Sequence, residues 1–387
     1  MRINTKTHTD ISVIDNSTDI TVYAPDPQIR QNYDAFVKYV RNLELKMRGY
    51  KTNEDAGPKP IASYRAARKT NEDADRAVLK DLTGNGHDLQ LKNFAWSGMS
   101  GFGGYSYNFA ERTVFEAYGP NTGVTRSSDT LYIEKVSKSN VNWRIKLDQF
   151  KCQLKITGVT EAINSGEIRQ FRIYNSKDVT NSINVKQYGV YDIDISLSTS
   201  TDKSYIYVFA DSPQYDLDNP LTLTTPIALE QLPLYPDALV FDGIDDYGIC
   251  EDFPALKDFT IIYKRINLNP SKTNQAFISN RSTEITKRLI IEHTYTNANV
   301  TIVGNSSKNI ASVYDPSKKP VYVLPTSYNG QISLGNPTFD PIIGLILGTY
   351  PSESSIYCWN GAFYALDIYD KTLEGDELQT ALNNIEK

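Results

Sequence analysis

The side chains that most often support catalysis are few in this sequence, and their spacing matches no common reaction motif. The three histidines, His8, His87 and His293, lack the paired spacing of a metal site. The sequence contains no metalloprotease, serine-hydrolase or nucleotide-binding motif. A glycine-rich run at residues 98–104 is not followed by Lys-Ser or Lys-Thr, so it indicates a turn and not a phosphate-binding loop. These patterns favour a binding or structural protein over an enzyme.

Paired carboxylates are the other arrangement that could support catalysis. A glycosidase needs two carboxylates that face one groove, about 5–10 Å apart. Asp192 and Asp194 share one face of an expected strand, but Tyr191, Ile193 and Ile195 occupy the opposite face, which is the ordinary alternation of a surface strand. We therefore predict that the protein is not an enzyme and that it has no catalytic residues.

Three acidic residues lie close together at Asp242, Asp245 and Asp246. Carboxylate oxygens that gather on a turn could bind Ca²⁺. Alternatively, Asp242 and Gly243 form the turn, and Asp245 and Asp246 accept hydrogen bonds from backbone amides, as aspartate often does. The second interpretation is favoured, so no cofactor is predicted, and calcium binding is the weaker alternative.

Aromatic side chains could bind a sugar ring, because an aromatic face combines apolar area with a polar rim. Trp143 is the candidate for glycan binding, since its neighbours Asn142 and Arg144 suggest an exposed position. Trp96 and Trp359 are expected in a hydrophobic core. Burial in a core or in a subunit interface is also the alternative for Trp143.

An N-terminal helix is predicted over residues 26–49, because Asp26 and Pro27 suit its beginning and Gly49 suits its end. Its apolar residues are spaced by alternating intervals of four and three, which is typical of a coiled coil. We expect this seam to join identical chains into a homodimer or a homotrimer, although an amphipathic helix that packs on its own chain would show a similar pattern. The seam consists of Ile29, Tyr33, Phe36, Val40, Leu43 and Met47.

Composition excludes several classes of protein. The chain has 40 basic and 46 acidic residues and a formal net charge of −6, so no nucleic-acid partner is expected. The sequence contains no run of about 18 apolar residues, which a membrane-spanning helix would need, and no secretion signal is recognisable. Neither membrane insertion nor export is therefore expected. The three cysteines are scattered and are expected to be reduced thiols.

Short apolar or aromatic runs alternate with turn residues from residue 61 onward, for example at 131–136, 152–156 and 205–209. Such runs predict a mainly β protein built from sandwiches or jelly rolls, and they argue against a parallel α/β sheet. A helical period returns after Thr372.

Three motifs resemble laminin-G-like, concanavalin-A-like jelly rolls. They are DLTGNGHDLQL at residues 81–91, LVFDGIDDY at residues 239–247, and NGAFYALDIYDKTLEGDEL at residues 360–378. The resemblance covers about 61–114 and 230–387, and it implies a discontinuous jelly roll. Residues 115–229, which separate the first two motifs, have their own strand pattern and are expected to form an inserted β-sandwich whose two ends lie side by side. The remaining chain divides into an N-terminal arm at 1–25, the helix at 26–49 and a linker at 50–60.

Two further stretches, Asn93–Tyr105 and residues 231–247, resemble virion proteins of gut-bacterial tailed phages such as crass-like phages. The resemblance implies an oligomeric head or tail fibre that is made in the host cytoplasm and resides in the virion. Its arm would bind other virion proteins of the capsid or tail, and its sandwiches could attach weakly to host-surface glycans. The alternative is an exported carbohydrate-binding module of a bacterial polysaccharide-utilisation system.

Overall fold

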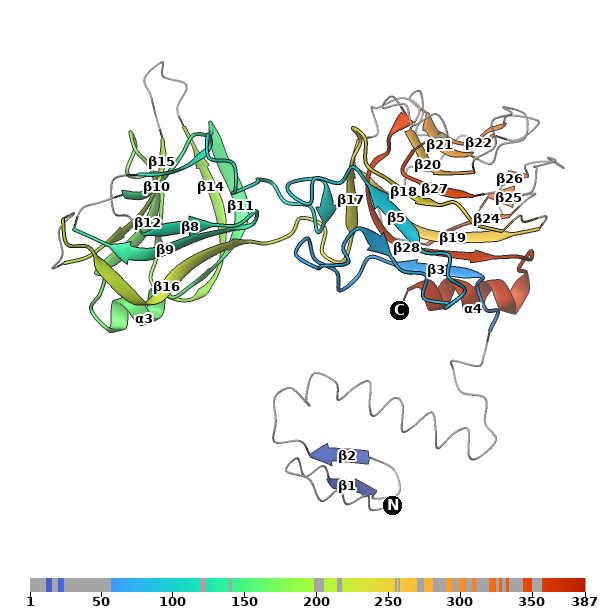
Figure 1. Ribbon diagram of the computed structural model, residues 1–387, viewed down its shortest axis with the longest axis horizontal. Coiled ribbons are helices and arrows are strands. Elements are labelled where there is room, and N and C mark those ends of the chain that lie inside the picture. The colour runs from blue at the N-terminus through green and yellow to red at the C-terminus, as the bar shows by residue number, and fades with distance from the viewer. Residues whose placement is uncertain are drawn as a thin grey trace. The chain divides into compact units, whose positions relative to one another are not determined.

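The computed structural model of this chain consists mainly of antiparallel β-strands, which confirms the predicted mainly β fold (Figure 1). The chain divides into two compact units, one formed by residues 1–59 and 373–387 and the other by residues 60–372. Within the described part of the chain, no helix is both long enough and apolar enough to cross a membrane. The structure describes residues 12–15, 20–23, 57–118, 123–138, 141–197, 205–213, 218–254, 256, 258–269, 275–280, 290–294, 299–303, 308–310, 320–324, 327–328, 332–333, 344–349 and 357–386.

The smaller unit holds a pair of strands and a helix. β1 (Ser12–Asp15) pairs antiparallel with β2 (Ile20–Tyr23). The helix α4 (Gly375–Ile385) begins after Glu374, whose backbone is extended. Ala381 and Ile385, four positions apart, are buried on this helix. This spacing accounts for the helical period in the sequence after Thr372. The predicted helix at 26–49 lies outside the described residues.

The larger unit contains a first pair of sheets with eight strands each. One sheet has the order β26 (Ile332–Ser333), β25 (Ser327–Tyr328), β24 (Val321–Leu324), β19 (Thr260–Asn267), β28 (Asn360–Tyr369), β17 (Leu239–Asp242) and β6 (Gly101–Phe102), with β3 (Ala62–Arg65) paired to β28. The other sheet has the order β23 (Lys308–Ile310), β22 (Asn299–Val303), β21 (Ile290–Thr294), β20 (Gln275–Ser279), β27 (Leu345–Leu347), β18 (Tyr247–Cys250), β5 (Leu89–Lys92) and β4 (Val78–Leu79).

One hydrophobic core lies between these two sheets. Phe241 and Ile261 reach it from the first sheet, and Leu91 and Phe277 reach it from the second. Since a sheet buries one face against another sheet, this shared core makes the pair a β-sandwich. The arrangement is compatible with a jelly roll.

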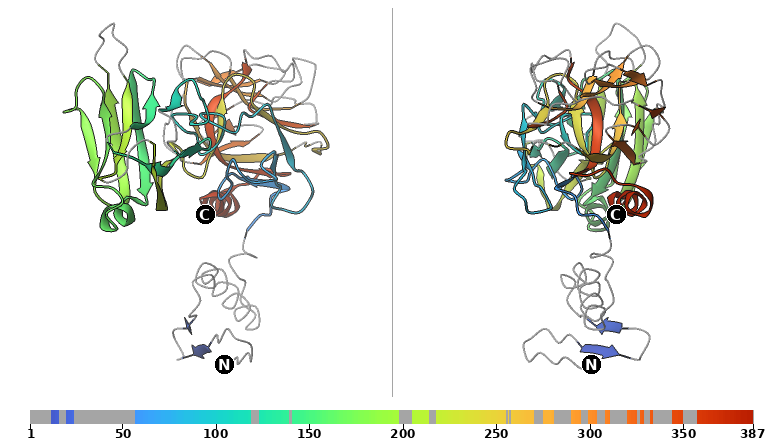
Figure 2. Two further views of the ribbon diagram at one scale, coloured as in Figure 1. Left: turned by 60° about the vertical axis from the view of Figure 1, so that its left-hand side comes forward. Right: turned by 90° about the vertical axis from the view of Figure 1, so that its right-hand side faces the viewer.

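A second pair of sheets has five strands in each sheet. The first has the order β13 (Ser182–Val185), β12 (Gln170–Asn175), β15 (Ile206–Asp211), β10 (Val141–Ile145) and β7 (Phe115–Ala117). The second has the order β14 (Gly189–Ser196), β11 (Gln149–Thr157), β16 (Leu221–Gln231), β9 (Thr130–Val136) and β8 (Val124–Arg126). A short helix, α3 (Val159–Asn164), follows β11. Figure 2 shows these green strands from two further directions.

The second pair of sheets encloses its own core. In β11, Phe150, Leu154 and Ile156 are buried, and Lys151 and Gln153 between them are exposed, as the period of two in this strand predicts. All buried residues of this core lie within residues 109–229, whereas those of the first core lie within 62–102 and 239–368. Two cores in this order are compatible with an inserted sandwich, whose exact boundaries stay a prediction.

The two chain segments that join the sandwiches run side by side. The Gln231 side chain accepts a hydrogen bond from the Tyr107 amide at 3.1 Å and donates one to the Tyr107 carbonyl at 3.0 Å. The amide of Tyr235 donates to the carbonyl of Gly103 at 2.8 Å. Gly103 has a φ of +82°, and a Cβ there would lie 2.7 Å from the Cβ of Pro233. The glycine-rich run therefore allows the backbone at Gly103 to approach the segment 233–235 closely, in agreement with its prediction as a turn.

Candidate functional site

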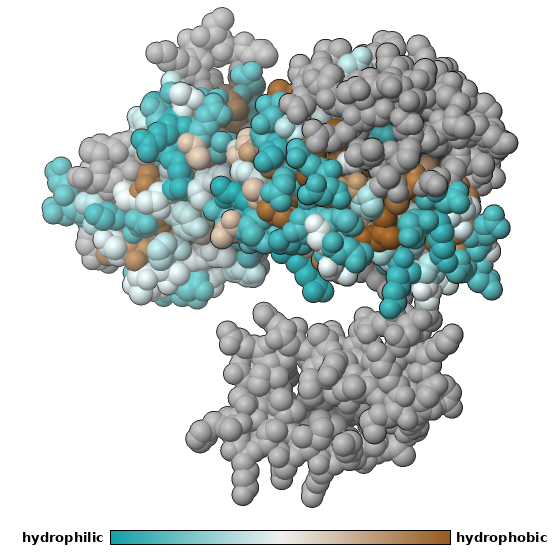
Figure 3. All heavy atoms as spheres, turned by 45° about the vertical axis from the view of Figure 1, so that its right-hand side comes forward, coloured by the Kyte–Doolittle hydropathy of each residue, from teal (hydrophilic) through white to brown (hydrophobic). Residues whose placement is uncertain are grey.

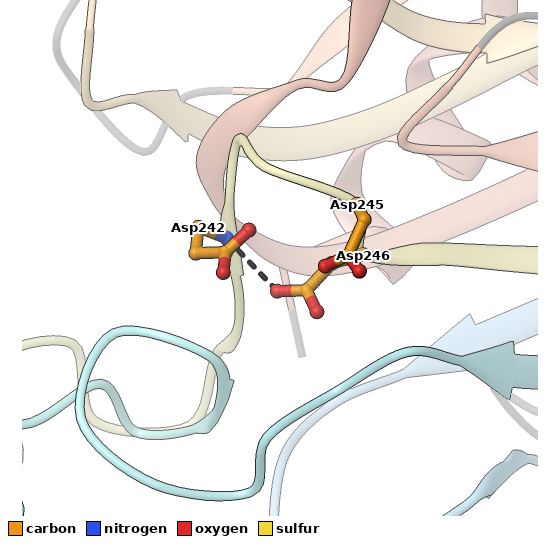
Figure 4. A group of neighbouring side chains, drawn as sticks. All are labelled: Asp242, Asp245 and Asp246. Carbon is orange, nitrogen blue, oxygen red and sulfur yellow. Dashed lines mark hydrogen bonds between the residues drawn. The ribbon is translucent and has the colours of Figure 1, made fainter. Parts of the chain in front are cut away.

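The acidic residues Asp242, Asp245 and Asp246 lie on the short connection between β17 and β18 (Figure 4). The backbone amide of Asp242 donates a hydrogen bond to Oδ2 of Asp246 at 2.9 Å, and the Ile244 amide donates to Oδ1 of Asp242 at 2.7 Å. Gly243 has a φ of +79°, and a Cβ there would lie 2.7 Å from the Cβ of Asn360. Hydrogen bonds that nearby backbone amides donate to aspartate carboxylates are typical of a structural turn.

Asp246 is the buried member of this acidic group. Its Oδ1 accepts a hydrogen bond from the Ser100 hydroxyl at 3.0 Å. Burial raises the pKa of Asp246 to about 7; the neighbouring carboxylates of Asp242 and Asp245 also raise it, while the hydrogen bonds from the Asp242 amide and the Ser100 hydroxyl lower it. The protonated form of this carboxyl therefore persists to unusually high pH.

The three carboxylates place oxygen atoms within 4.8 Å of one another, which is close enough for them to share a cation. The predicted turn bonding is present for Asp242 and Asp246. The Asp245 side chain is exposed and accepts no hydrogen bond within the described residues, which differs from its predicted role. Calcium binding by this group stays the weaker alternative to a structural turn.

Trp143 is not available to a glycan, and its prediction as an exposed stacking residue is wrong. Its side chain is 0% exposed and belongs to the core of the second sandwich. The indole N–H donates to the carbonyl of Tyr132 at 3.3 Å, and the guanidinium of Arg126 lies 4.9 Å from the ring centroid. Its polar neighbour Asn142 is buried as well, because its side chain bonds the Lys135 carbonyl and the Ala210 amide. Polar neighbours therefore did not indicate exposure here.

The other residues considered from the sequence have varied outcomes. Trp359 is fully buried in the first core, which confirms its prediction, whereas Trp96 is only partly buried and packs against that core. Asp194 pairs with Lys151 at 2.8 Å, and Asp192 accepts a hydrogen bond from Gln153 at 2.7 Å. These two carboxylates thus interact with their neighbours on an exposed sheet surface, as the alternating pattern predicts. The residues of the predicted coiled-coil seam lie outside the described residues: Ile29, Tyr33, Phe36, Val40, Leu43 and Met47.

Hydropathy does not single out a binding surface on the described part of the chain. The coloured residues on the side drawn in Figure 3 are mostly hydrophilic, with small separate hydrophobic patches. Within the described residues, the exposed large hydrophobic side chains are scattered singly along the sequence, as at Leu82, Val179 and Ile244. Such isolated residues are normal for a protein surface.

A more distinctive surface is the outward face of the sheet β13-β12-β15-β10-β7. Side chains on this face alternate with core residues along each strand, for example Arg172 and Tyr174 around the buried Ile173. We name this surface the tyrosine–arginine face, and it consists of Glu116, Tyr118, Arg144, Arg172, Tyr174, Tyr205, Tyr207 and Phe209.

One row of residues crosses all five strands of this sheet. The backbone register places Ser182 opposite Tyr174, Tyr174 opposite Tyr207, Tyr207 opposite Arg144, and Arg144 opposite Glu116. Directly opposite side chains in antiparallel strands lie in contact range. The register therefore brings together residues that are far apart in the sequence.

Aromatic rings and guanidinium groups interact along this row. The Tyr205 and Tyr207 rings are stacked at an interplanar angle of 12° with centroids 6.2 Å apart, and the Tyr174 ring meets Tyr207 edge-on at 5.6 Å. The guanidinium of Arg144 lies 4.5 Å from the Tyr205 centroid and 5.0 Å from the Tyr118 centroid. These contacts fix the rings in place through stacking and cation–π attraction.

Arg144 and Glu116 form an ion pair on this face. Nε of Arg144 donates to Oε2 of Glu116 at 2.7 Å, and its Nη2 donates to the same oxygen. This hydrogen bond raises the pKa of Arg144 and lowers the pKa of Glu116. Burial raises the pKa of Tyr174 and of Tyr207, so both hydroxyls stay protonated in neutral solution.

The sequence contains part of the signal for this face. Tyr205, Tyr207 and Phe209 alternate with buried aliphatic residues, and Arg172 and Tyr174 alternate in the same way, which indicates one polar aromatic face in each strand. The order of the strands in the sheet is not visible in that pattern. Comparison with protein-family models and with curated protein sequences found no match to this chain.

Proposed function

We propose that this chain is a structural protein of a tailed-phage virion, an oligomeric head or tail fibre that displays β-sandwiches for attachment to host-surface glycans. The proposal combines the virion-like motifs at Asn93–Tyr105 and residues 231–247 with the predicted coiled-coil seam. The seam would join two or three copies, and the N-terminal arm would bind capsid or tail proteins. Several copies would let weak glycan contacts act together, because avidity can raise the effective affinity by about 10²–10⁴.

One structural observation supports a binding role over catalysis. The outward face of a sheet in the second sandwich presents fixed aromatic rings and guanidinium groups, whereas the surface carboxylates Asp192 and Asp194 are engaged with neighbouring side chains. A retaining or inverting glycosidase needs two free carboxyl groups across its substrate. An attachment protein needs only a rigid surface that recognises sugar.

Labelling of intact particles tests the location of the protein. Phage particles from a host that expresses this chain would be incubated with gold-conjugated antibodies against residues 60–372 and imaged by negative-stain electron microscopy. Gold on head or tail appendages is the expected result, and antibody absorbed with the purified protein is the control. Unlabelled particles, with the antigen found in the cell envelope, would contradict the proposal and favour the exported carbohydrate-binding module.

Mass photometry of the purified full chain tests the oligomer. We expect a dimer or trimer that dissociates when Val40 and Leu43 are both replaced by Asp, because charge in the seam removes the buried apolar contact. Lys38→Asp is the matched control, since this position lies outside the predicted a and d positions. A wild-type chain that is monomeric at micromolar concentration would contradict the fibre.

A further inference from the structure

We propose that the tyrosine–arginine face of the second sandwich binds an acidic polysaccharide, whose sugar rings lie on the tyrosine rings and whose carboxylates pair with the guanidinium groups. The inference rests on the proposed attachment function and names its ligand class. It is carried by the geometry, the unpaired polar atoms and the charge of this one surface.

The rings offer a platform of the size and chemistry that a sugar requires. Tyr205 and Tyr207 are nearly parallel, and Tyr118 lies 6.0 Å from Tyr207 at an interplanar angle of 31°. Tyr118 is 38% exposed, and the other two tyrosines are half-buried. A ring that is anchored at one edge and open on the other presents apolar area beside a polar hydroxyl, which suits the apolar face of a pyranose.

Polar atoms on this face have unused hydrogen-bonding capacity. Within the described residues, the hydroxyl groups of Tyr118, Tyr174, Tyr205 and Tyr207 have no hydrogen-bond partner in the protein. Nε of Arg172 is buried and has no partner either, while its Nη2 donates to the Val179 carbonyl at 3.1 Å. The tyrosine hydroxyls on this half-buried to exposed surface can therefore bond with a polar ligand, whereas the buried Nε of Arg172 is closed to it.

The charge of the face favours an anion. Arg144 and Arg172 carry two positive charges and Glu116 carries one negative charge, so the face has a net charge of +1 in a chain with a net charge of −6, and Lys146 beside it, 3.3 Å from Glu116, adds another positive charge. Arg169 and Asp211, farther along the same sheet, form a neutral pair. A locally positive surface on an acidic protein attracts acidic ligands, and a guanidinium group forms charge-assisted hydrogen bonds with a carboxylate.

Two other occupants are less consistent with these observations. A nucleic-acid site normally neutralises several phosphates with a basic patch, whereas this face offers only Arg144, Arg172 and the neighbouring Lys146. A second copy of this chain is less consistent because Glu116 and Lys146 lie among or beside the rings of this face, and the cores of protein interfaces are depleted of Glu and Lys. Self-association through this face is nevertheless an outcome that the experiment separates.

Affinity electrophoresis and calorimetry with the full-length protein test the inference. The probes are polygalacturonate and hyaluronan as acidic polysaccharides, methyl-esterified polygalacturonate as the same backbone without charge, and dextran as a neutral glucan. We expect binding to at least one acidic probe, weakening with added salt, and much weaker binding to the methyl ester and to dextran.

Variants assign the binding to the face. Tyr207→Ala and Arg172→Gln should each weaken binding about tenfold. Tyr188→Ala and Lys151→Gln are matched controls, because both residues are exposed on the other sheet and its edge, and they should bind like wild type. Unchanged thermal melting of all four variants shows that the fold is intact.

Three results would overturn the inference. They are no binding of either acidic probe at about millimolar saccharide, equal loss in the control variants, and a Tyr207→Ala variant whose self-association is lost while glycan binding is unaffected. Gold-labelled virions without glycan binding would refute this inference alone, whereas glycan binding without labelled virions would refute the proposed fibre alone.

Discussion

The buried carboxyl of Asp246 makes the stability of the first sandwich depend on pH. In the folded protein the pKa of Asp246 is raised to about 7, whereas in the unfolded chain it lies near 3.8. The folded state therefore holds this proton more tightly, and between these two values stability falls as the pH rises. At about 1.4 kcal/mol per pKa unit, the full effect on the free energy of unfolding is about 4 kcal/mol.

Asp246→Asn removes this dependence. The amide oxygen can still accept the hydrogen bond from the Asp242 amide, and its NH₂ group can donate to the Ser100 hydroxyl, so the turn keeps both contacts. We expect the variant to be less sensitive to pH than wild type between pH 4 and 7, and to be more stable than wild type at pH 8.

Hydrogen exchange in EDTA measures the pH dependence of stability in the first sandwich, which contains Asp246. Peptides that cover residues 237–250 report opening of the first sandwich alone, in the presence of increasing urea at each pH. Asp192→Asn is the control, because this exposed acid lies on the second sandwich and should leave those peptides unchanged. Wild type and Asp246→Asn with parallel pH dependence would refute the burial argument.

Three further changes test the architecture. Trp143→Ala should destabilise the second sandwich by about 3–5 kcal/mol, measured by urea unfolding, because a fully buried indole leaves a cavity; a loss below 1 kcal/mol would contradict its core position. Gln231→Ala should lower the free energy of unfolding by roughly 1–3 kcal/mol in the same assay, since both backbone groups of Tyr107 lose their hydrogen-bond partner. Melting temperatures in millimolar Ca²⁺ and in EDTA should be equal if the Asp242 turn is purely structural, and a higher value in Ca²⁺ would establish the cation site instead.

The strand patterns of the sequence predicted the fold class well. The alternation of Phe150, Leu154 and Ile156 with polar residues marks β11 directly, because a strand in a half-exposed sheet repeats every two residues. The turn at Asp242 and Gly243 was also predictable, since aspartate and glycine have local reasons to occupy a turn. Local chemistry alone was sufficient for both.

The candidate site was only partly predictable. Trp143 has polar neighbours in the sequence, but alternation in β10 directs it inward and directs Arg144 outward. The choice between the two faces of a strand depends on which face meets another sheet, and a short run around Trp143 does not record this. The predicted binding residue was Trp143, which faces the core. The exposed aromatic surface begins at the next residue, Arg144, on the opposite face of the same sheet.

The mainly β character, the positions of many strands and the residues that prefer turns can be read from the amino-acid order, because they follow from side-chain shape and from contacts between near neighbours. The row formed by Arg144, Tyr207 and Tyr174 and the burial of Asp246 become visible only in the folded protein. Strand order and burial arise from pairings between distant segments, and the free energy of such pairings depends on the whole packed core rather than on any local pattern.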